Sequence, residues 1–255
     1  MSNINTANEQ VPVLVFGGPT ALIEYGGLRF LTDPTFDGPG DYPLGDLTLA
    51  KTAPSSIDPA DLAPVDAVLL SHDEHPDNLD TSGRAFLADV PLTLTTPSGA
   101  GRLGGAARPL APWDSVELER PGGGTATVTG MPALHGPEGS EPMVGEVIGF
   151  MLTAEDLPTV YISGDNASVD VVREIAGRFG PVDTAVIFAG AVRTPMFDGA
   201  LLTVDGTRAA EVAEILGARR VVPAHVDSWK HFTEGRDELV AAFETAGLSD
   251  RLQLN

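Results

Sequence analysis

Histidine is rare in this chain, and the places of its five residues point to metal chemistry. Two of them, His72 and His75, lie with four acidic residues in the segment LLSHDEHPDNLD (69–80). His135 and His225 end the apolar runs TGMPALH and RRVVPAH, and a fourth run of this kind, TVYISGD, ends in Asp165. Neutral imidazole and carboxylate are ligands for zinc, iron and manganese. We therefore expect these strand ends to converge on a metal site.

Each of these features alone has an ordinary structural explanation. A single His135 or His225 is more often a hydrogen-bonded, partly buried histidine than a ligand. Asp165 could cap a helix that follows it, and the segment 69–80 could be a solvated turn with Asp77 as a helix cap. Four apolar runs end in or beside a histidine or aspartate, which favours a common metal site. Unrelated structural histidines would have no reason to gather at strand ends.

Composition limits the chemistry and the partners. The chain has no cysteine, so only nitrogen and oxygen donors remain for a metal. With 36 acidic against 15 basic residues the net charge is -21, which disfavours nucleic acids and anionic membranes as partners. The start of the chain, MSNINTANEQ, resembles no export signal, and no apolar stretch is long enough to span a bilayer. We expect a cytoplasmic protein with a small-molecule substrate, and a homo-oligomer is compatible with the sequence.

The elements that must position these residues differ between the two halves of the chain. Short apolar runs at 11–18, 20–27 and 28–36 predict a β-meander, followed by a Pro- and Gly-rich loop at 37–46. The run VDAVLLSH predicts a buried strand that ends at the histidine cluster. After a helical stretch, another strand, a hairpin at 115–135 and two further β segments, strands and helices alternate from residue 168 onwards.

This order predicts an α/β fold in which two sheets pack together with helices outside. No linker divides the halves, and no repeat is visible at a fixed period. We expect a flexible N-terminus over residues 1–10 and a single domain over residues 11–255.

The order of these motifs resembles the metallo-β-lactamase superfamily. The segments DPTF, ALHGP, YISGDN and VVPAHVD together are similar to its UlaG-like metallohydrolase branch, over about residues 11–250. The resemblance implies a four-layer αββα sandwich, with two mixed β-sheets packed face to face, helices outside and a metal site at one edge of the sheets. It also places Asp33 near the site, although a turn before proline explains this residue equally well.

The family motif H-x-H-x-D-H can be placed on this sequence in two registers. If His72 is the first histidine, Pro76 falls at the essential aspartate and cannot coordinate a metal. If His75 is the second histidine, Asp77 keeps its place, and Asp73 and Asn78 replace the two outer histidines. We prefer the second register, in which His72 orients a ligand through a hydrogen bond.

In this register the resemblance implies two sites for divalent ions. Asp73, His75 and His135 would hold the first, and Asp77, Asn78 and His225 the second, with Asp165 bridging. Asn78 is the weakest donor, so the second site could be empty or hold a harder ion. The expected cofactor is one or two ions of zinc, manganese or iron.

The expected reaction is metal-dependent hydrolysis of a small carbonyl compound, a lactone, ester or amide, by a metal-activated water. Asp77, Asp165 and His135 are the expected catalytic residues. Arg193, Trp229 and His231 are candidates for substrate binding, although ordinary surface or packing roles explain them as well. A lactonase is one activity of this class. The alternative is a metal-poor family member that acts as a binding or regulatory module, because histidine is missing at positions 73 and 78.

Overall fold

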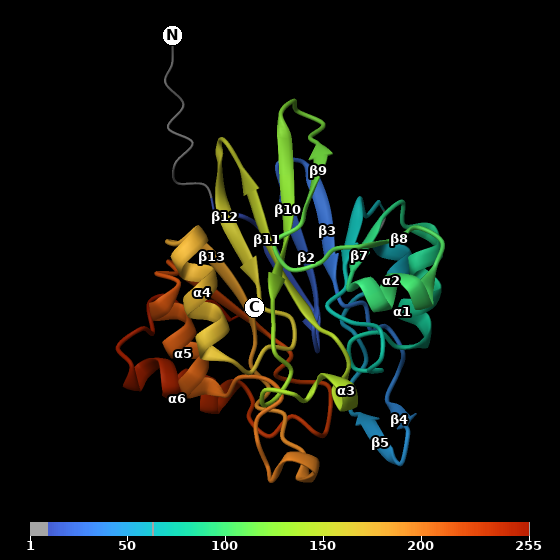
Figure 1. Cartoon of the computed structure of the whole chain (residues 1–255), viewed down its shortest axis with the longest axis vertical. Coiled ribbons are helices and arrows are strands. Elements are labelled where there is room, and N and C mark those ends of the chain that lie inside the picture. The colour runs from blue at the N-terminus through green and yellow to red at the C-terminus, as the bar shows by residue number, and fades with distance from the viewer. Residues whose placement is uncertain (1–9, 63, 255) are drawn as a thin grey trace.

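The computed structural model describes residues 10–62 and 64–254 (Figure 1). Except for Gln10, the segment that we expected to form a flexible N-terminus lies outside the described residues. Among the described residues, no helix combines the length and the apolar character that a membrane span requires.

The first of two six-stranded sheets has the order β1-β2-β3-β6-β7-β8. Its strands are β1 (Val13–Gly17), β2 (Thr20–Tyr25), β3 (Leu28–Thr32), β6 (Ala67–Leu69), β7 (Thr93–Thr95) and β8 (Ala107–Pro109). The expected meander forms the antiparallel part, β1 to β3, and the other three strands continue parallel to β3. Parallel neighbours need crossover connections, and α1 (Thr81–Phe86) and α2 (Pro97–Leu103) lie in two of them.

The second sheet has the order β14-β13-β12-β11-β10-β9. Its strands are β9 (Ser115–Glu119), β10 (Thr125–Pro132), β11 (Ile148–Ala154), β12 (Leu157–Ile162), β13 (Thr184–Phe188) and β14 (Arg220–Ala224). β9 to β12 are antiparallel neighbours, and β12 to β14 run parallel. The helices α4 (Val169–Phe179), α5 (Gly206–Ile215) and α6 (Arg236–Thr245) belong to this half.

The sheets pack face to face, with α4, α5 and α6 outside the second sheet and α1 and α2 outside the first, which gives the expected αββα order of layers (Figure 1). The consecutive apolar residues of β6 are explained by burial on both faces of the strand. Ala67 and Leu69 belong to the core between the sheets, whereas Val68 and Leu70 pack under α1. Side chains of a strand alternate between its faces, so a strand buried on both faces needs an unbroken apolar run.

Some elements were not predicted from the sequence. A hairpin of β4 (Gly40–Leu44) and β5 (Leu47–Lys51) forms within and after the segment expected to be a loop, and α3 (Glu141–Val144) is a single short turn. The short 3-10 turn η4 (Pro195–Phe197) was not predicted either, whereas η2 (Pro59–Asp61) and η3 (Leu87–Asp89) lie in stretches whose sequence favours a helical turn. Strands that follow glycine and proline this closely have little sequence signal of their own.

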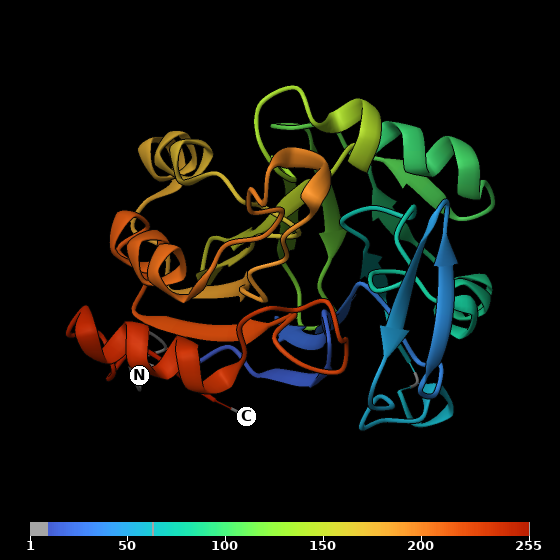
Figure 2. The same ribbon diagram turned by 90° about the horizontal axis from the view of Figure 1, so that it is seen from below.

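A buried ion pair fixes the β4–β5 hairpin beside the histidine cluster. Lys51, at the end of β5, places its Nζ 2.9 Å from Oδ2 of Asp80, and these side chains are 1% and 0% exposed. Asp80 also caps α1, because its Oδ1 accepts a hydrogen bond from the backbone N–H of Gly83. Seen from below, the hairpin, α3, the η4 segment and the segment after β14 surround one end of the sandwich (Figure 2).

Candidate metal centre

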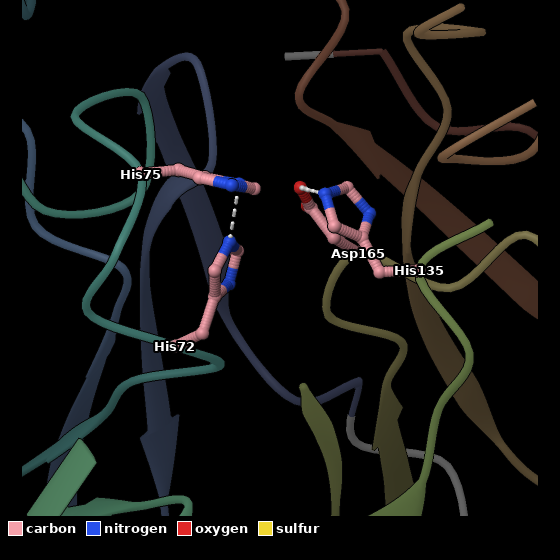
Figure 3. Close-up of side chains that lie close together, drawn as sticks. All are labelled: His72, His75, His135 and Asp165. Atoms are coloured by element: carbon pink, nitrogen blue, oxygen red, sulfur yellow. Dashed lines mark hydrogen bonds and ion pairs between the residues drawn. The ribbon is translucent and has the colours of Figure 1, made fainter. Parts of the chain in front are cut away.

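The segments that follow β6, β10, β12 and β14 meet at this end of the sandwich. Donor atoms of His72, His75, His135 and Asp165 all lie within 4.8 Å of one another and could hold a metal ion. Figure 3 shows their side chains pointing toward one another, the first two from the segment after β6 and the others from the opposite sheet. The structure thus brings together residues that are 93 positions apart at most, from Asp165 back to His72.

A second group of donors adjoins the first and shares Asp165 with it. Donor atoms of Asp77, Asp165 and His225 also lie within 4.8 Å of one another, and all three side chains are buried. The Nε2 of His225 lies 3.2 Å from Oδ2 of Asp77 and 3.6 Å from Oδ1 of Asp165. The backbone of His225 has a φ of 60°, and its N–H donates to the carbonyl of Gly18 at 2.6 Å. The turn after β14 thereby directs the imidazole inward.

Hydrogen bonds on the far side of the rings orient two of the histidines. His135 Nδ1 donates to the carbonyl of Leu202 at 2.8 Å, which leaves its Nε2 facing Asp165. Ser71 Oγ donates to Asp33 at 2.6 Å and therefore accepts from His72 Nδ1 at 2.9 Å. His72 Nε2 is then unprotonated and lies 2.9 Å from His75 Nδ1. Partners of this kind fix the tautomer and direction of histidine ligands.

Burial and neighbouring charges give the histidines of the two donor groups different protonation states. Burial lowers the pKa of His72 well below its usual value and that of His135 to about 4, so both rings are neutral at pH 7. Burial alone would also lower the pKa of His225, but the carboxylates of Asp165 and Asp77 outweigh it and raise that pKa. Burial of Asp77 is likewise outweighed by hydrogen bonds from His225 and His231, which hold its pKa well below the usual range.

The structure gives the amide nitrogen of Asn78 two acceptors. Its Nδ2 donates to Asp33 Oδ2 at 3.0 Å and to Asp165 Oδ1 at 3.2 Å. Because both partners are carboxylates, the amide presents its N–H groups to them, and its Oδ1 is buried without a hydrogen-bond partner. Asn78 thus links two buried carboxylates, and its expected role as a ligand through Oδ1 stays a prediction.

Asp73, which we also expected among the ligands, lies outside both donor groups. Its carboxylate accepts from Arg102 Nη2 at 2.5 Å and from Arg102 Nε at 3.0 and 3.1 Å. Two residues separate His72 from His75, so the backbone can turn both rings inward while Asp73 points to α2. His72, to which the preferred register gave an orienting role, is a member of the first group.

The three residues expected to bind substrate lie in different surroundings. Trp229 is buried against Tyr42, with ring centroids 5.3 Å apart, as a packing residue would be. Arg193 donates to the carbonyl of Gly199 at 3.0 Å and pairs with Asp205 at 3.7 Å, and neither partner belongs to a donor group. His231 reaches the centre, because its Nε2 lies 2.9 Å from Asp77 Oδ2.

Of the supporting residues Asp33 and Ser71, only Asp33 was named from the sequence, and its role was left open. Asp33 is 1% exposed and accepts from Ser71 and Asn78, and burial raises its pKa to about 7. It thus connects, through one residue each, to His72 and Asp165. The segment TDPTF was the only signal for Asp33, and none pointed to Ser71 or to the pairing of Asp73 with Arg102.

The residues present fit a divalent metal ion. Neutral imidazoles and carboxylates converge, and two buried atoms beside them, Asp77 Oδ1 and Asn78 Oδ1, have no hydrogen-bond partner in the structure. Buried polar atoms are rarely left unpaired, and an ion beside Asp77 would give its Oδ1 a partner.

Comparisons with known proteins agree with this geometry. Residues 28–226 match the family described as the beta-lactamase superfamily domain. The chain belongs to the beta-lactamase superfamily. It is 25% identical over 233 residues to a UPF0173 metal-dependent hydrolase of Pyrococcus horikoshii, with 88% of each chain covered. We place it among the metal-dependent hydrolases of this superfamily.

Solved structures of other proteins share the fold of this chain. An isothiocyanate hydrolase from Delia radicum gut bacteria has a TM-score of 0.79 and 21% identity, with 95% of each chain covered. A possible metal-dependent hydrolase from Veillonella parvula has a TM-score of 0.81 and 16% identity, covering 96% of this chain and 97% of the other. At these identities the likeness confirms the four-layer fold and leaves the substrate open.

Proposed function

We propose that the protein hydrolyses a small carbonyl compound, a lactone, ester or amide, at a metal centre built from the two donor groups. His72, His75, His135 and Asp165 would hold one ion, and Asp77, Asp165 and His225 a second. The observation that carries the proposal is the convergence of donors from four separate strand ends into two adjoining groups, each with its donor atoms within 4.8 Å of one another.

The donor sets favour different ions. Three imidazoles and one carboxylate suit zinc or iron, whereas two carboxylates and one imidazole tilt the second site toward a harder ion such as manganese. Because the second set has one donor fewer, we propose that it binds its ion more weakly than the first.

When bound, a divalent ion supplies Lewis acidity, which acidifies water and polarises a carbonyl group. The chain's own residues hold and orient the reactants. Asp165 is fixed by Asn78, and His231 holds Oδ2 of Asp77, so that Oδ1 of Asp77 would remain as a donor to an ion. His135 is directed by the carbonyl of Leu202.

An isothiocyanate also has an electrophilic carbon that water can attack, and the structural relative named above acts on such a compound. A substrate panel should therefore contain an isothiocyanate beside lactones, esters and amides.

The test is elemental analysis of the protein purified without chelator, together with assays of the panel. We expect one or two equivalents of transition metal, loss of hydrolysis on chelation and recovery on reconstitution. His135→Ala should lose metal and activity together. Metal-free protein of unchanged stability would instead support the alternative, a binding or regulatory module.

A further inference from the structure

The first donor group is reached from solvent on one side. His75 is its only partly exposed member, and the other three side chains are buried. A cavity of about 480 Å³ opens on His75, between the end of β4 and helices α1, α2 and α3. A substrate that approaches the first group along His75 must therefore occupy this cavity.

The cations in the cavity wall are already engaged by acidic neighbours. Arg102 binds both oxygens of Asp73 and places its Nη2 2.9 Å from Oε2 of Glu74. Arg84 donates to the backbone carbonyl of Asp73 at 2.9 Å and lies 3.9 Å from its carboxylate. These pairs offset the positive charge that the two guanidinium groups would otherwise present to an anionic ligand.

Carboxylates outnumber the cations in this wall. Asp73, Glu74 and Glu141 face two guanidinium groups, so one negative charge is left over. The whole chain carries a net charge of -21, which adds repulsion for any approaching anion.

The rest of the wall is apolar. Leu44, Pro142, Met143 and Val144 line it, and Met143 is 55% exposed although its side chain is hydrophobic. An exposed methionine at the mouth of a cavity offers a flexible surface to an apolar group.

We propose that this cavity selects uncharged substrates with an apolar group and rejects anionic ones, phosphorylated compounds included. The inference rests on the proposed function and gives its substrate class. It differs from a phosphate-binding site, which would present unpaired cations to the ligand.

The test compares phenyl acetate with 4-sulfophenyl acetate on the metal-loaded full chain. Each kcat/KM is divided by the rate constant for hydroxide-catalysed hydrolysis of the same ester, which corrects for the leaving group. We expect the neutral ester to be preferred by roughly tenfold or more, because one ester carries a charge into an acidic cavity.

A charge reversal in the wall should change this preference. Glu141→Lys should raise the relative kcat/KM of the sulfonated ester about tenfold. Glu119→Lys is the matched control, because Glu119 is exposed at the end of β9, at the opposite end of the sandwich (Figure 1). An equal response of both variants would mean that net charge alone, and not the cavity, sets the preference, and it would overturn the proposal.

Binding of inert ketones separates the two proposals. Acetophenone should bind the loaded protein more tightly than 4-acetylbenzenesulfonate, as measured by calorimetry. Preference for acetophenone without turnover of any compound of the substrate panel would overturn the proposed function and support the cavity assignment. Equal or tighter binding of the sulfonate, or binding of neither ketone, would overturn the cavity assignment.

Discussion

The two donor groups share Asp165 but differ in what surrounds their donors. The first has three imidazoles, of which His72 and His135 are kept neutral by burial. The second has two carboxylates and His225, whose pKa those carboxylates raise. A cation that enters the first group meets the lone pairs of neutral imidazoles, whereas a cation that enters the second competes with a proton on His225. One edge of the fold thus provides two sites that should bind metal with unequal strength.

The largest effect should follow from removing the shared residue. Asp165→Ala takes a donor from both groups, so we expect loss of bound metal and a fall in hydrolysis by roughly a thousandfold or more. Elemental analysis and initial rates measure it. Asp170→Ala, an exposed aspartate on α4, is the control. Two retained equivalents of metal in Asp165→Ala would show that the groups do not share a ligand.

A smaller effect, confined to the first group, should follow from His72→Ala. We expect its metal affinity to fall by about a hundredfold or more, measured by competition with a chelator. Asp73→Asn should keep the metal, because its carboxylate is held by Arg102. The reverse result, metal lost in Asp73→Asn and kept in His72→Ala, would restore the register that we preferred from the sequence.

His225→Ala tests the second group alone. We expect the stoichiometry to fall by one equivalent at saturating metal while the tighter ion remains, because none of the first group's donors is changed. Calorimetric titration with manganese and zinc would resolve the two sites. Loss of the tighter ion would show that the groups bind as one unit.

The smallest effect concerns Asp33 in the metal-free protein. Burial raises its pKa from 3.8 to about 7, so its contribution to stability is full below pH 3.8 and is lost as the pH rises through 7. In chelator, the free energy of unfolding of the wild type should fall between pH 5 and 8 relative to Asp33→Asn. The difference should change by at most about 1.4 kcal/mol per pH unit.

Asp37→Asn provides the contrast for that experiment. Although burial alone would raise the pKa of Asp37, hydrogen bonds from Ser82 and Thr81 lower it. Its contribution is therefore present throughout pH 5 to 8 and is lost only at lower pH. If Asp37→Asn changes the pH dependence of the free energy of unfolding as much as Asp33→Asn does, this pH dependence is wrongly assigned to Asp33.

The sequence predicted the convergence because it depends on long apolar runs with polar ends. The strands before His135, Asp165 and His225 are buried, and their hydrophobic pattern places the polar residues at the sheet edge. The αββα layers followed from the order of elements and from the family resemblance. These features depend on neighbours in the sequence or on the burial of whole strands.

The arrangement between residues 72 and 78 could not be read in the same way. It depends on Arg102, which is 29 positions from Asp73, and on Asp33, which is 45 positions from Asn78. Each partner decides where a side chain of the short loop points, and neither leaves a local pattern. The β4–β5 hairpin was missed for a related reason, because Asp80, which pairs with Lys51 of β5, stabilises it from outside its own sequence.

The left-handed backbone at His225 has a consequence for the evolution of the protein. A residue with a β carbon is disfavoured there by about 1–2 kcal/mol, whereas glycine adopts this conformation freely. Glycine would relieve this strain, but it would also leave the buried carboxylates of Asp77 and Asp165 without their imidazole partner. We therefore expect histidine to persist at this position even under selection for heat resistance alone.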